Sequence, residues 1–222
     1  MDITADDLDR DGYYIPTNNL EADEILIGRN LGTVRFRGSI TAKGCIVAKS
    51  GSGIYAGGDI HAGRGIHADW GIDAEGGIRS GRDIQAGRGI NADLGIRSGR
   101  HIISDWDIRT GRHIISGGGV NAGSGINAVG SVFSEGIIIA GKDLNAGLGI
   151  HADQHITVVG DITTTGDICA GLSISAKSIS TPSQIRAGIS RWMILTPEGM
   201  KIRAEIKQGT VAHGTLVTRE EA

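Results

Sequence analysis

Aliphatic residues recur every six positions along most of the chain. From position 54 to position 174 they lead 21 consecutive hexads without a slip in phase, and 18 of these lead residues are Ile. The residue two positions later is small or short, being Ala in 13 hexads, Ser in five, Thr in two and Val in one. Because residues i and i+2 of a strand point to the same side, each hexad predicts a short strand with both of these residues facing inward.

The other positions of each hexad predict an outward side chain and a corner. The residue between the two inward positions is mostly polar, as at His61 and Arg79. The last three positions are rich in Gly and Asp, which favour turns. Three hexads give an 18-residue triangular turn, and GIRSGRDI at 77–84 recurs as GIRSGRHI at 95–102, a shift of 18.

We therefore predict an all-β fold, a triangular parallel β-solenoid with about seven regular turns. Successive turns are expected to stack ~4.8 Å apart, so that each lead Ile lies on the Ile of the next turn. A helical alternative is excluded, because a period of six does not place the Ile residues on one helical stripe.

The flanking segments predict capped ends. Residues 1–24 carry eight acidic residues against one basic residue, which predicts an acidic N-terminal arm or cap. The solenoid is expected across residues 25–179, with a two-residue insertion before the regular hexads. Thr181-Pro182 is expected to end the array, and residues 180–222 to form a β-rich cap that covers its open edge.

Composition and charge narrow the setting of the protein. The chain has 222 residues, of which 37 are Gly and only 4% are aromatic, so its core must pack Ile against Ala and Gly. The formal net charge of −3 is not typical of a nucleic-acid-binding protein. Two distant cysteines, Cys45 and Cys169, fit a reducing compartment. The chain shows no apolar leader or membrane-spanning run, so we expect a cytoplasmic protein.

Stacking every third hexad on the one before places outward side chains in columns. Between residues 60 and 112 the chain has eight Arg and no Lys, and Arg is enriched in protein interfaces. One corner column sets Arg88 between two Trp residues, which favours cation–π stacking. We predict one partner-binding face from these residues: Trp70, Arg88, Trp106, Arg64, Arg82, Arg100, Arg79 and Arg97.

The alternative is a solvated surface on which carboxylates balance the arginines. The carboxylates that would do so are Asp69, Asp83, Asp93, Asp105 and Asp107. Exposed Trp is unusual on a monomer and favours the binding interpretation. Given the net charge, we expect a protein partner or self-association; the arginines are also compatible with a nucleic acid, which is not favoured.

No pattern in the chain predicts a metal, a cofactor or catalysis. Residues 7–12 match the start of a calcium loop, but its twelfth position is Asn18 rather than Glu. His151, Asp153 and His155 alternate along one hexad, where surface side chains are the more common outcome. Walker A, zinc-finger and nucleophile-elbow patterns are absent from the sequence. We therefore predict a protein that is not an enzyme.

The segment ITTTGDICAGLSISAKSI, together with the 18-residue coil, resembles the bactofilins, a family of polymer-forming bacterial cytoskeletal β-helices. The resemblance covers residues 34–179 and implies a right-handed solenoid that polymerises end to end without nucleotide. The chain departs from the family over 183–222, which predicts an ordered cap, and in lacking an apolar membrane-targeting stretch. The hexapeptide acyltransferases are a second comparison, but they place the small residue before the aliphatic residue rather than after it.

We expect a non-enzymatic binding protein that presents a rigid Arg/Trp face to a protein partner, such as an inhibitor of a host complex. Rigid repeat surfaces lose little entropy on binding. The alternative is a bactofilin-like polymer-forming scaffold, and the third class is a hexapeptide-type acyltransferase. Filaments would favour the scaffold, whereas a discrete monomer or dimer would favour the binding protein.

Overall fold

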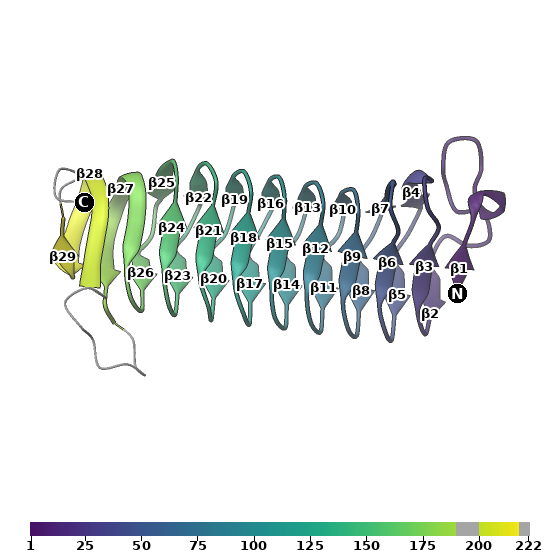
Figure 1. Ribbon diagram of the computed structural model, residues 1–222, viewed down its shortest axis with the longest axis horizontal. Helices are drawn as coiled ribbons and strands as arrows, with labels where there is room; N and C mark the ends of the chain where they lie inside the picture. The colour runs from purple at the N-terminus through teal and green to yellow at the C-terminus, as the bar shows by residue number, and fades with distance from the viewer. Residues whose placement is uncertain (190–199, 218–222) are drawn as a thin grey trace.

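The computed structural model describes residues 1–189 and 200–217. Over these residues the chain winds into a parallel β-solenoid of about 10 turns, which form a straight row in Figure 1. The predicted all-β solenoid is confirmed. The turns outnumber the regular ones expected because the chain on both sides of the regular hexads also coils. The right-handed sense of the coil stays a prediction.

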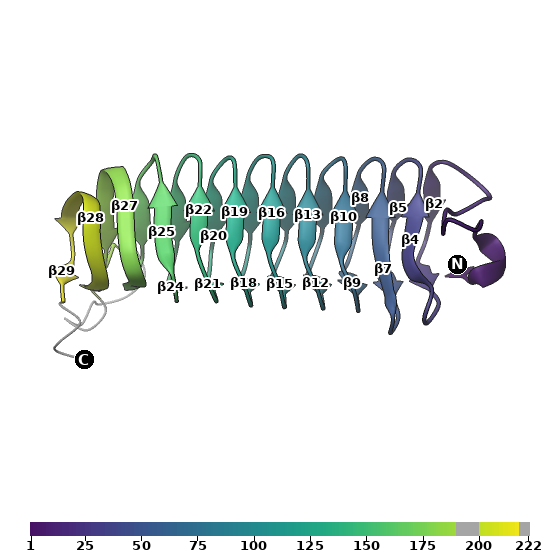
Figure 2. The ribbon, with the colours of Figure 1, turned by 90° about the horizontal axis from the view of Figure 1, so that it is seen from above.

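Each turn contributes one strand to each of three faces, because every strand of the regular turns pairs with the third strand before it and the third strand after it. Figure 2 shows the strands of face A side by side along the rod. Face A comprises β4 (Gly32–Phe36), β7 (Ser52–Ala56), β10 (Ile72–Ala74), β13 (Ile90–Ala92), β16 (Ile108–Thr110), β19 (Ile126–Ala128), β22 (Leu144–Ala146) and β25 (Asp161–Thr164).

The chain passes from face A to face B and then to face C in every turn, so three corners result: A–B, B–C and C–A. Face B comprises β2 (Leu20–Ala22), β5 (Ile40–Ala42), β8 (Ile60–Ala62), β11 (Ile78–Ser80), β14 (Ile96–Ser98), β17 (Ile114–Ser116), β20 (Val132–Ser134), β23 (Ile150–Ala152) and β26 (Ile168–Ala170). Face C comprises β1 (Asp2–Ile3), β3 (Ile25–Ile27), β6 (Ile46–Ala48), β9 (Ile66–Ala68), β12 (Ile84–Ala86), β15 (Ile102–Ser104), β18 (Val120–Ala122), β21 (Ile138–Ala140) and β24 (Ile156–Val158).

The pairing register follows the hexad period. Ile72 lies opposite Ile90, one regular turn later. The predicted insertion lengthens the preceding turn, so that Val34 lies opposite Ile54. Because each turn repeats the phase of the last, the lead aliphatic residues stack on one another along each face.

The lead aliphatic residues and their short partners form the core. Every lead residue from Ile54 to Ile174 is at most 1% exposed. Ser and Thr at the third position are also buried, and their hydroxyls bond to the neighbouring turn. Ser134 Oγ donates to the Gly118 carbonyl at 2.6 Å and accepts from the Gly136 amide at 3.1 Å. Across the described residues, no buried side-chain nitrogen or oxygen lacks a hydrogen-bond partner.

The N-terminal segment adds strands to the solenoid as well as a cover. Strand β1 pairs with β3 on face C, and β2 pairs with β5 on face B. Between them lie a 3-10 helix, Ala5–Asp7, and a loop whose Tyr14 is buried against Phe36, with ring centroids 5.5 Å apart. The predicted boundary after residue 24 stays a prediction.

At the other end the chain keeps stacking after the regular hexads. Strand β27 (Ile174–Ala187) runs across all three faces, so Thr181-Pro182 does not end the array. Strand β28 (Lys201–His213) stacks on β27, and β29 (Thr215–Leu216) stacks on β28. Residues 190–199 and 218–222 of the predicted C-terminal cap lie outside the described residues, and the boundary at residue 180 stays a prediction.

Candidate functional site

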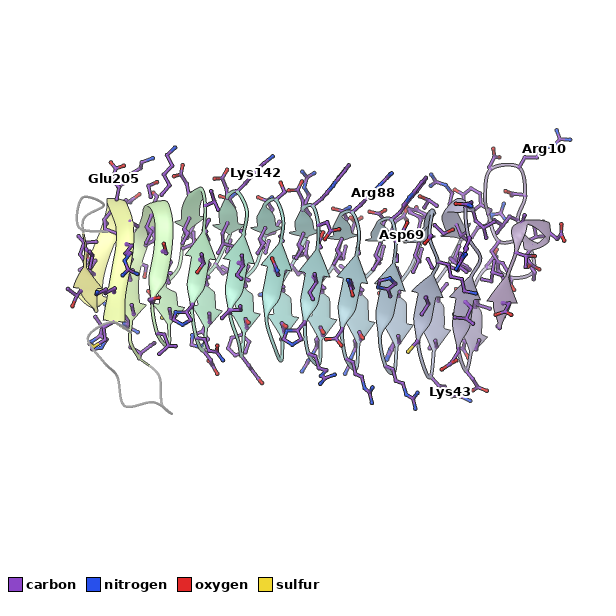
Figure 3. The ribbon with its side chains drawn as sticks, in the orientation of Figure 1. Arg10, Lys43, Asp69, Arg88, Lys142 and Glu205 are labelled. Atoms are coloured by element: carbon purple, nitrogen blue, oxygen red, sulfur yellow. The ribbon has the colours of Figure 1, made fainter. Side chains whose placement is uncertain are left out.

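The predicted Trp–Arg column lies on the C–A corner. Arg88 Cζ lies 4.2 Å from the Trp70 ring centroid and 5.8 Å from the Trp106 ring centroid. Both distances are within cation–π range, since the three residues occupy the same position in successive turns. Trp106 is 59% exposed, and Arg88 projects from the upper edge of the molecule in Figure 3. The stacking of Arg88 between two indoles is confirmed, and its role in binding stays a prediction.

Trp70 is positioned by the longer turns beside it. The inserted residues lie at the same C–A corner, where Gly32 and Gly51 adopt φ values of 66° and 76°. A Cβ atom at Gly53 would lie 3.2 Å from the Trp70 Cβ, and one at Gly32 would lie 3.9 Å from the indole. The missing side chain at Gly53 therefore leaves room for the half-buried Trp70, whereas Gly32 is favoured by its positive φ.

Ser104 positions the other end of the stack. Ser104 is 2% exposed, and its hydroxyl bonds to backbone groups of the C–A corner. The Ser104 hydroxyl donates to the Arg88 carbonyl and accepts from the Trp106 amide at 3.2 Å. One buried hydroxyl therefore ties together the backbones that carry two members of the stack.

A polar groove runs between the stack and face A. Asn91 Nδ2 donates to Asp73 Oδ1 at 2.6 Å, and Arg109 pairs with Asp107 at 2.9 Å. A hydrogen bond from the Gly125 amide holds the pKa of the Asp107 carboxyl below its usual range, although burial opposes the shift. The groove is lined by Thr33, Trp70, Gly71, Asp73, Arg88, Gly89, Asn91, Trp106, Asp107 and Arg109.

The face A residues of this groove were not predicted to lie beside the stack. Asp73, Asn91 and Arg109 each lie three positions after a member of the stack. Three positions after a corner residue comes the outward position of the next strand. The hexad repeat could therefore have predicted that these residues lie beside the stack.

The other five predicted residues lie away from the stack. Arg64, Arg82 and Arg100 occupy the B–C corner, while Arg79 and Arg97 lie in register on face B. Figure 3 shows the separation of the two corners, with Arg88 at the upper edge and Lys43, which lies on the B–C corner, at the lower edge.

The predicted single face is therefore divided into two surfaces. The C–A corner is the vertex of the triangle opposite face B, and one hexad, which forms a side, spans up to ~20 Å. The eight residues were grouped because of their charge and their 18-residue spacing. However, two columns that are six residues apart in the sequence lie on different corners of the triangle.

Carboxylates balance few of the arginines between residues 60 and 112. Arg100 lies 3.9 Å from Asp83, and Arg109 pairs with Asp107. Asp69 and Asp83 each accept a hydrogen bond from a backbone amide of the adjacent turn. No carboxylate of the described chain lies within 4.0 Å of the other six arginines of this segment.

Acidic and His residues at the corners have a structural role that their polarity alone does not indicate. Asp107 Oδ1 accepts from the Gly125 amide at 2.9 Å, and His113 Nδ1 accepts from the Ser131 amide at 2.9 Å. In each case the acceptor directly precedes a lead Ile and the donor lies one turn later. These bonds hold successive turns in register, and that spacing could have predicted them.

In the two sequence patterns considered as metal sites, the carboxylate and imidazole groups form hydrogen bonds with nearby protein groups. Asp9 Oδ1 accepts from the Asp11 and Tyr13 amides at 3.0 and 2.8 Å. His151 pairs with Asp153 at 2.8 Å on face B, whereas His155 contacts the Ser173 hydroxyl. In the part of the chain that the structure describes, no group of three or more His, Cys, Asp or Glu side chains could hold a metal ion.

Cysteines and helices bear on the expected cellular setting. Cys45 and Cys169 are both free and half-buried. Burial raises the pKa of the Cys169 thiol, and the nearby Arg186 opposes that shift. Among residues 1–189 and 200–217, no helix has the length and apolar character needed to cross a membrane. The cytoplasmic location stays a prediction.

No protein-family model, curated protein or solved structure matches this chain. The parallel 18-residue solenoid is consistent with a bactofilin-like fold, but no match shows that the chain belongs to that family. The functional interpretation depends on the surface chemistry described above.

Proposed function

We propose that the protein is a non-enzymatic binding protein that uses the C–A corner around Trp70, Arg88 and Trp106 to hold a protein partner. The observation that carries this proposal is the stack itself. It places two indoles and a guanidinium on the outside of a rigid rod, with Trp106 59% exposed. Trp and Arg are the side chains most enriched among the residues that dominate interface energetics.

Preorganisation favours tight binding at this corner. The stack is supported by the glycines beside Trp70 and by the Ser104 hydroxyl, so these side chains are ordered before a partner arrives. Ordering a flexible side chain on binding costs about 0.5–1.5 kcal/mol, which a preassembled stack largely avoids.

The chemistry of the groove indicates the kind of protein surface that fits it. A guanidinium stacked on aromatic rings keeps its edge N–H groups available for carboxylates. Arg109 and the amide of Asn91 in the same groove already bond to Asp107 and Asp73, whereas no carboxylate of the described residues lies within 4.0 Å of Arg88. We therefore expect a partner that presents a carboxylate together with an apolar or aromatic side chain for Trp106.

Quantitative affinity capture from the native cells tests the proposal. The baits are the wild type, the Trp70→Ala/Arg88→Ala/Trp106→Ala variant and a matched control, Lys142→Ala/Val159→Ala, at the far end of the same corner. We expect a partner that is retained by the wild type and the control and is lost by the triple variant. Circular dichroism should show unchanged folding, because the three substituted side chains lie outside the core. Retention of every partner by the triple variant would overturn the proposal.

A polymer-forming scaffold is the alternative function, and one observation favours it. Among the described residues, only two residues of β29 pair with the outer edge of β28, and most of the side chains from Glu205 to His213 are exposed. An uncovered strand edge can pair with another chain. Analytical ultracentrifugation at rising concentration separates the two functions, since a scaffold would form long assemblies and a binding protein would remain a discrete species.

A further inference from the structure

The arginines on face B and its two bordering corners form a surface separate from the C–A corner that carries Trp70, Arg88 and Trp106. We name this the arginine surface and define it by six residues: Arg64, Arg79, Arg82, Arg97, Arg100 and Arg112. The side chains of Arg79 and Arg97 project from adjacent strands β11 and β14. Arg112 lines a shallow groove together with them. The groove is also lined by His61, Leu94, His113, Ile115 and Asp59, whose carboxylate accepts from the Gly77 amide.

Like charges face each other on this surface. Arg79 lies directly opposite Arg97, and strands in a sheet are ~4.8 Å apart. Like charges in directly opposite positions destabilise a sheet. Arg100 has the one ion pair of the six within the described residues, at 3.9 Å from Asp83. An anionic ligand would relieve this repulsion, so the surface is complementary to a row of carboxylates or phosphates.

The outward column of face B changes from basic to apolar as it continues. After Arg79 and Arg97 come Ile115, Phe133 and His151, each in register with the one before. The Phe133 and His151 rings stack with their centroids 5.1 Å apart and a 5° angle between planes. The exposed Leu148 on the A–B corner lines a second groove with both rings.

This sequence of basic and then apolar positions distinguishes a peptide from a nucleic acid. A phosphate backbone would be complementary to the arginines but would leave Ile115, Phe133 and Leu148 unmatched. Single-stranded nucleic acids are usually held by aromatic rings placed among the cationic groups. Here the Phe133 ring lies beyond the cationic segment and is already stacked on His151. A peptide with acidic residues followed by apolar residues matches both halves.

We propose that face B binds an extended protein segment along the rod axis, with its acidic residues over β11 and β14 and its apolar residues over β17 to β23. Five adjacent strands span ~19 Å at ~4.8 Å per step. An extended peptide covers that length with about six residues at ~3.3 Å each. Face B is therefore a second binding surface, independent of the C–A corner around Trp70, Arg88 and Trp106.

Fluorescence anisotropy with synthetic labelled peptides tests this proposal on the full-length protein. The probes are Glu-Glu-Glu-Glu-Leu-Phe-Leu, its reversed sequence, an alternating peptide of the same composition, and a 12-nucleotide oligothymidylate. We expect one of the two block peptides to bind at least threefold more tightly than the alternating peptide and than the oligonucleotide. Raising the salt concentration should weaken its binding, because the arginines are exposed.

Substitutions test the basic half and the apolar half of the face B surface separately. Arg79→Glu/Arg97→Glu should weaken binding of the preferred block peptide at least tenfold, and Phe133→Ala/Leu148→Ala at least threefold. The Trp70→Ala/Arg88→Ala/Trp106→Ala variant is the matched control and should bind the peptide unchanged, which separates this test from that of the proposed function. The proposal is overturned if no block peptide binds, if the Arg79→Glu/Arg97→Glu variant binds normally while folded, or if the oligonucleotide binds as tightly as the peptide.

Discussion

The central turns and the final turns of the solenoid both stack in parallel, but they differ in pairing register and in the hydrogen bonds that join successive turns. In the central turns lead residues pair in one constant register, and buried hydroxyls bond to carbonyl groups of the neighbouring turn. In β27 the turn shortens, so that Ser178 lies opposite Asp161, and β28 pairs with β27 through several register shifts. There, side-chain pairs such as Ser178 with Asp161, at 2.7 Å, join the turns. The solenoid therefore continues without a fixed period as long as strands keep stacking in parallel.

The largest effect is expected from a charge placed in the central core. Ile96 is 1% exposed, so Ile96→Asp buries an unpaired carboxylate and should destabilise the fold by at least about 4 kcal/mol. Its outward neighbour provides the control, since Arg97→Ala should change stability by no more than about 0.5 kcal/mol. Urea denaturation followed by circular dichroism measures both, and equal stability of the two variants would contradict the inward and outward assignment.

The same substitution in the last turns sharpens the comparison. Ile202 is fully buried, but it lies in β28 with few turns beyond it. We expect Ile202→Asp to release β28 while the central turns stay folded, because each turn of a solenoid contacts only its neighbours. Hydrogen exchange should show lost protection in residues 200–217 alone; lost protection throughout the rod would contradict this expectation.

A pair of glycines tests how tightly the central corners approach one another. A Cβ atom at Gly81 would lie 2.1 Å from the Gly63 carbonyl oxygen, whereas one at Gly65 would lie 3.6 Å from its nearest neighbour. Gly81→Ala should therefore lower stability by about 2 kcal/mol, since backbone must move. Gly65→Ala should be neutral or stabilising by up to about 1 kcal/mol, because it restricts the unfolded chain. Equal melting temperatures for the two variants would show that the corners are not closely packed.

The buried hydroxyls should contribute less. Ser104→Ala removes the hydrogen bonds to the Arg88 carbonyl and the Trp106 amide and should cost about 1–2 kcal/mol. Ala occupies this position in many other turns, so the packing itself is tolerated. The fluorescence of Trp106 should also change if the hydroxyl positions the stack, and an unchanged spectrum and stability would contradict that role.

The smallest effect is a pH dependence at the final turns. Hydrogen bonds from the Ser178 and Ser183 hydroxyls lower the pKa of Asp161 and of Asp167, respectively. A lowered pKa in the folded state stabilises the fold above the ordinary Asp value of about 3.9, and this contribution is lost as the pH falls through the lowered value. Hydrogen exchange in β27, after correction for its intrinsic rate, should therefore rise below about pH 4. The rise should be weaker in Ser178→Ala/Ser183→Ala, and an identical profile would contradict the assignment.

The regular hexads allowed the inward and outward residues, the length of the turn and the Trp70–Arg88–Trp106 column to be predicted, because one phase fixes all three. The hexad position of each arginine also determines whether it lies on a corner or on face B. This can be predicted only after each hexad has been assigned to one of the three sides of the triangle. The path of β27 through Thr181-Pro182 could not be predicted in this way. Proline usually interrupts a strand, and here the hexad period that would override that rule is already lost.

The claim that the C–A corner is a rigid binding surface for a protein is tested most directly by an affinity measurement on purified components. Isothermal titration calorimetry should compare the captured partner's affinity for the wild type and for Trp70→Ala/Arg88→Ala/Trp106→Ala. We predict binding at least about 30-fold weaker in the variant, corresponding to about 2 kcal/mol, with an unchanged melting temperature. Equal affinities for the two proteins would contradict the claim.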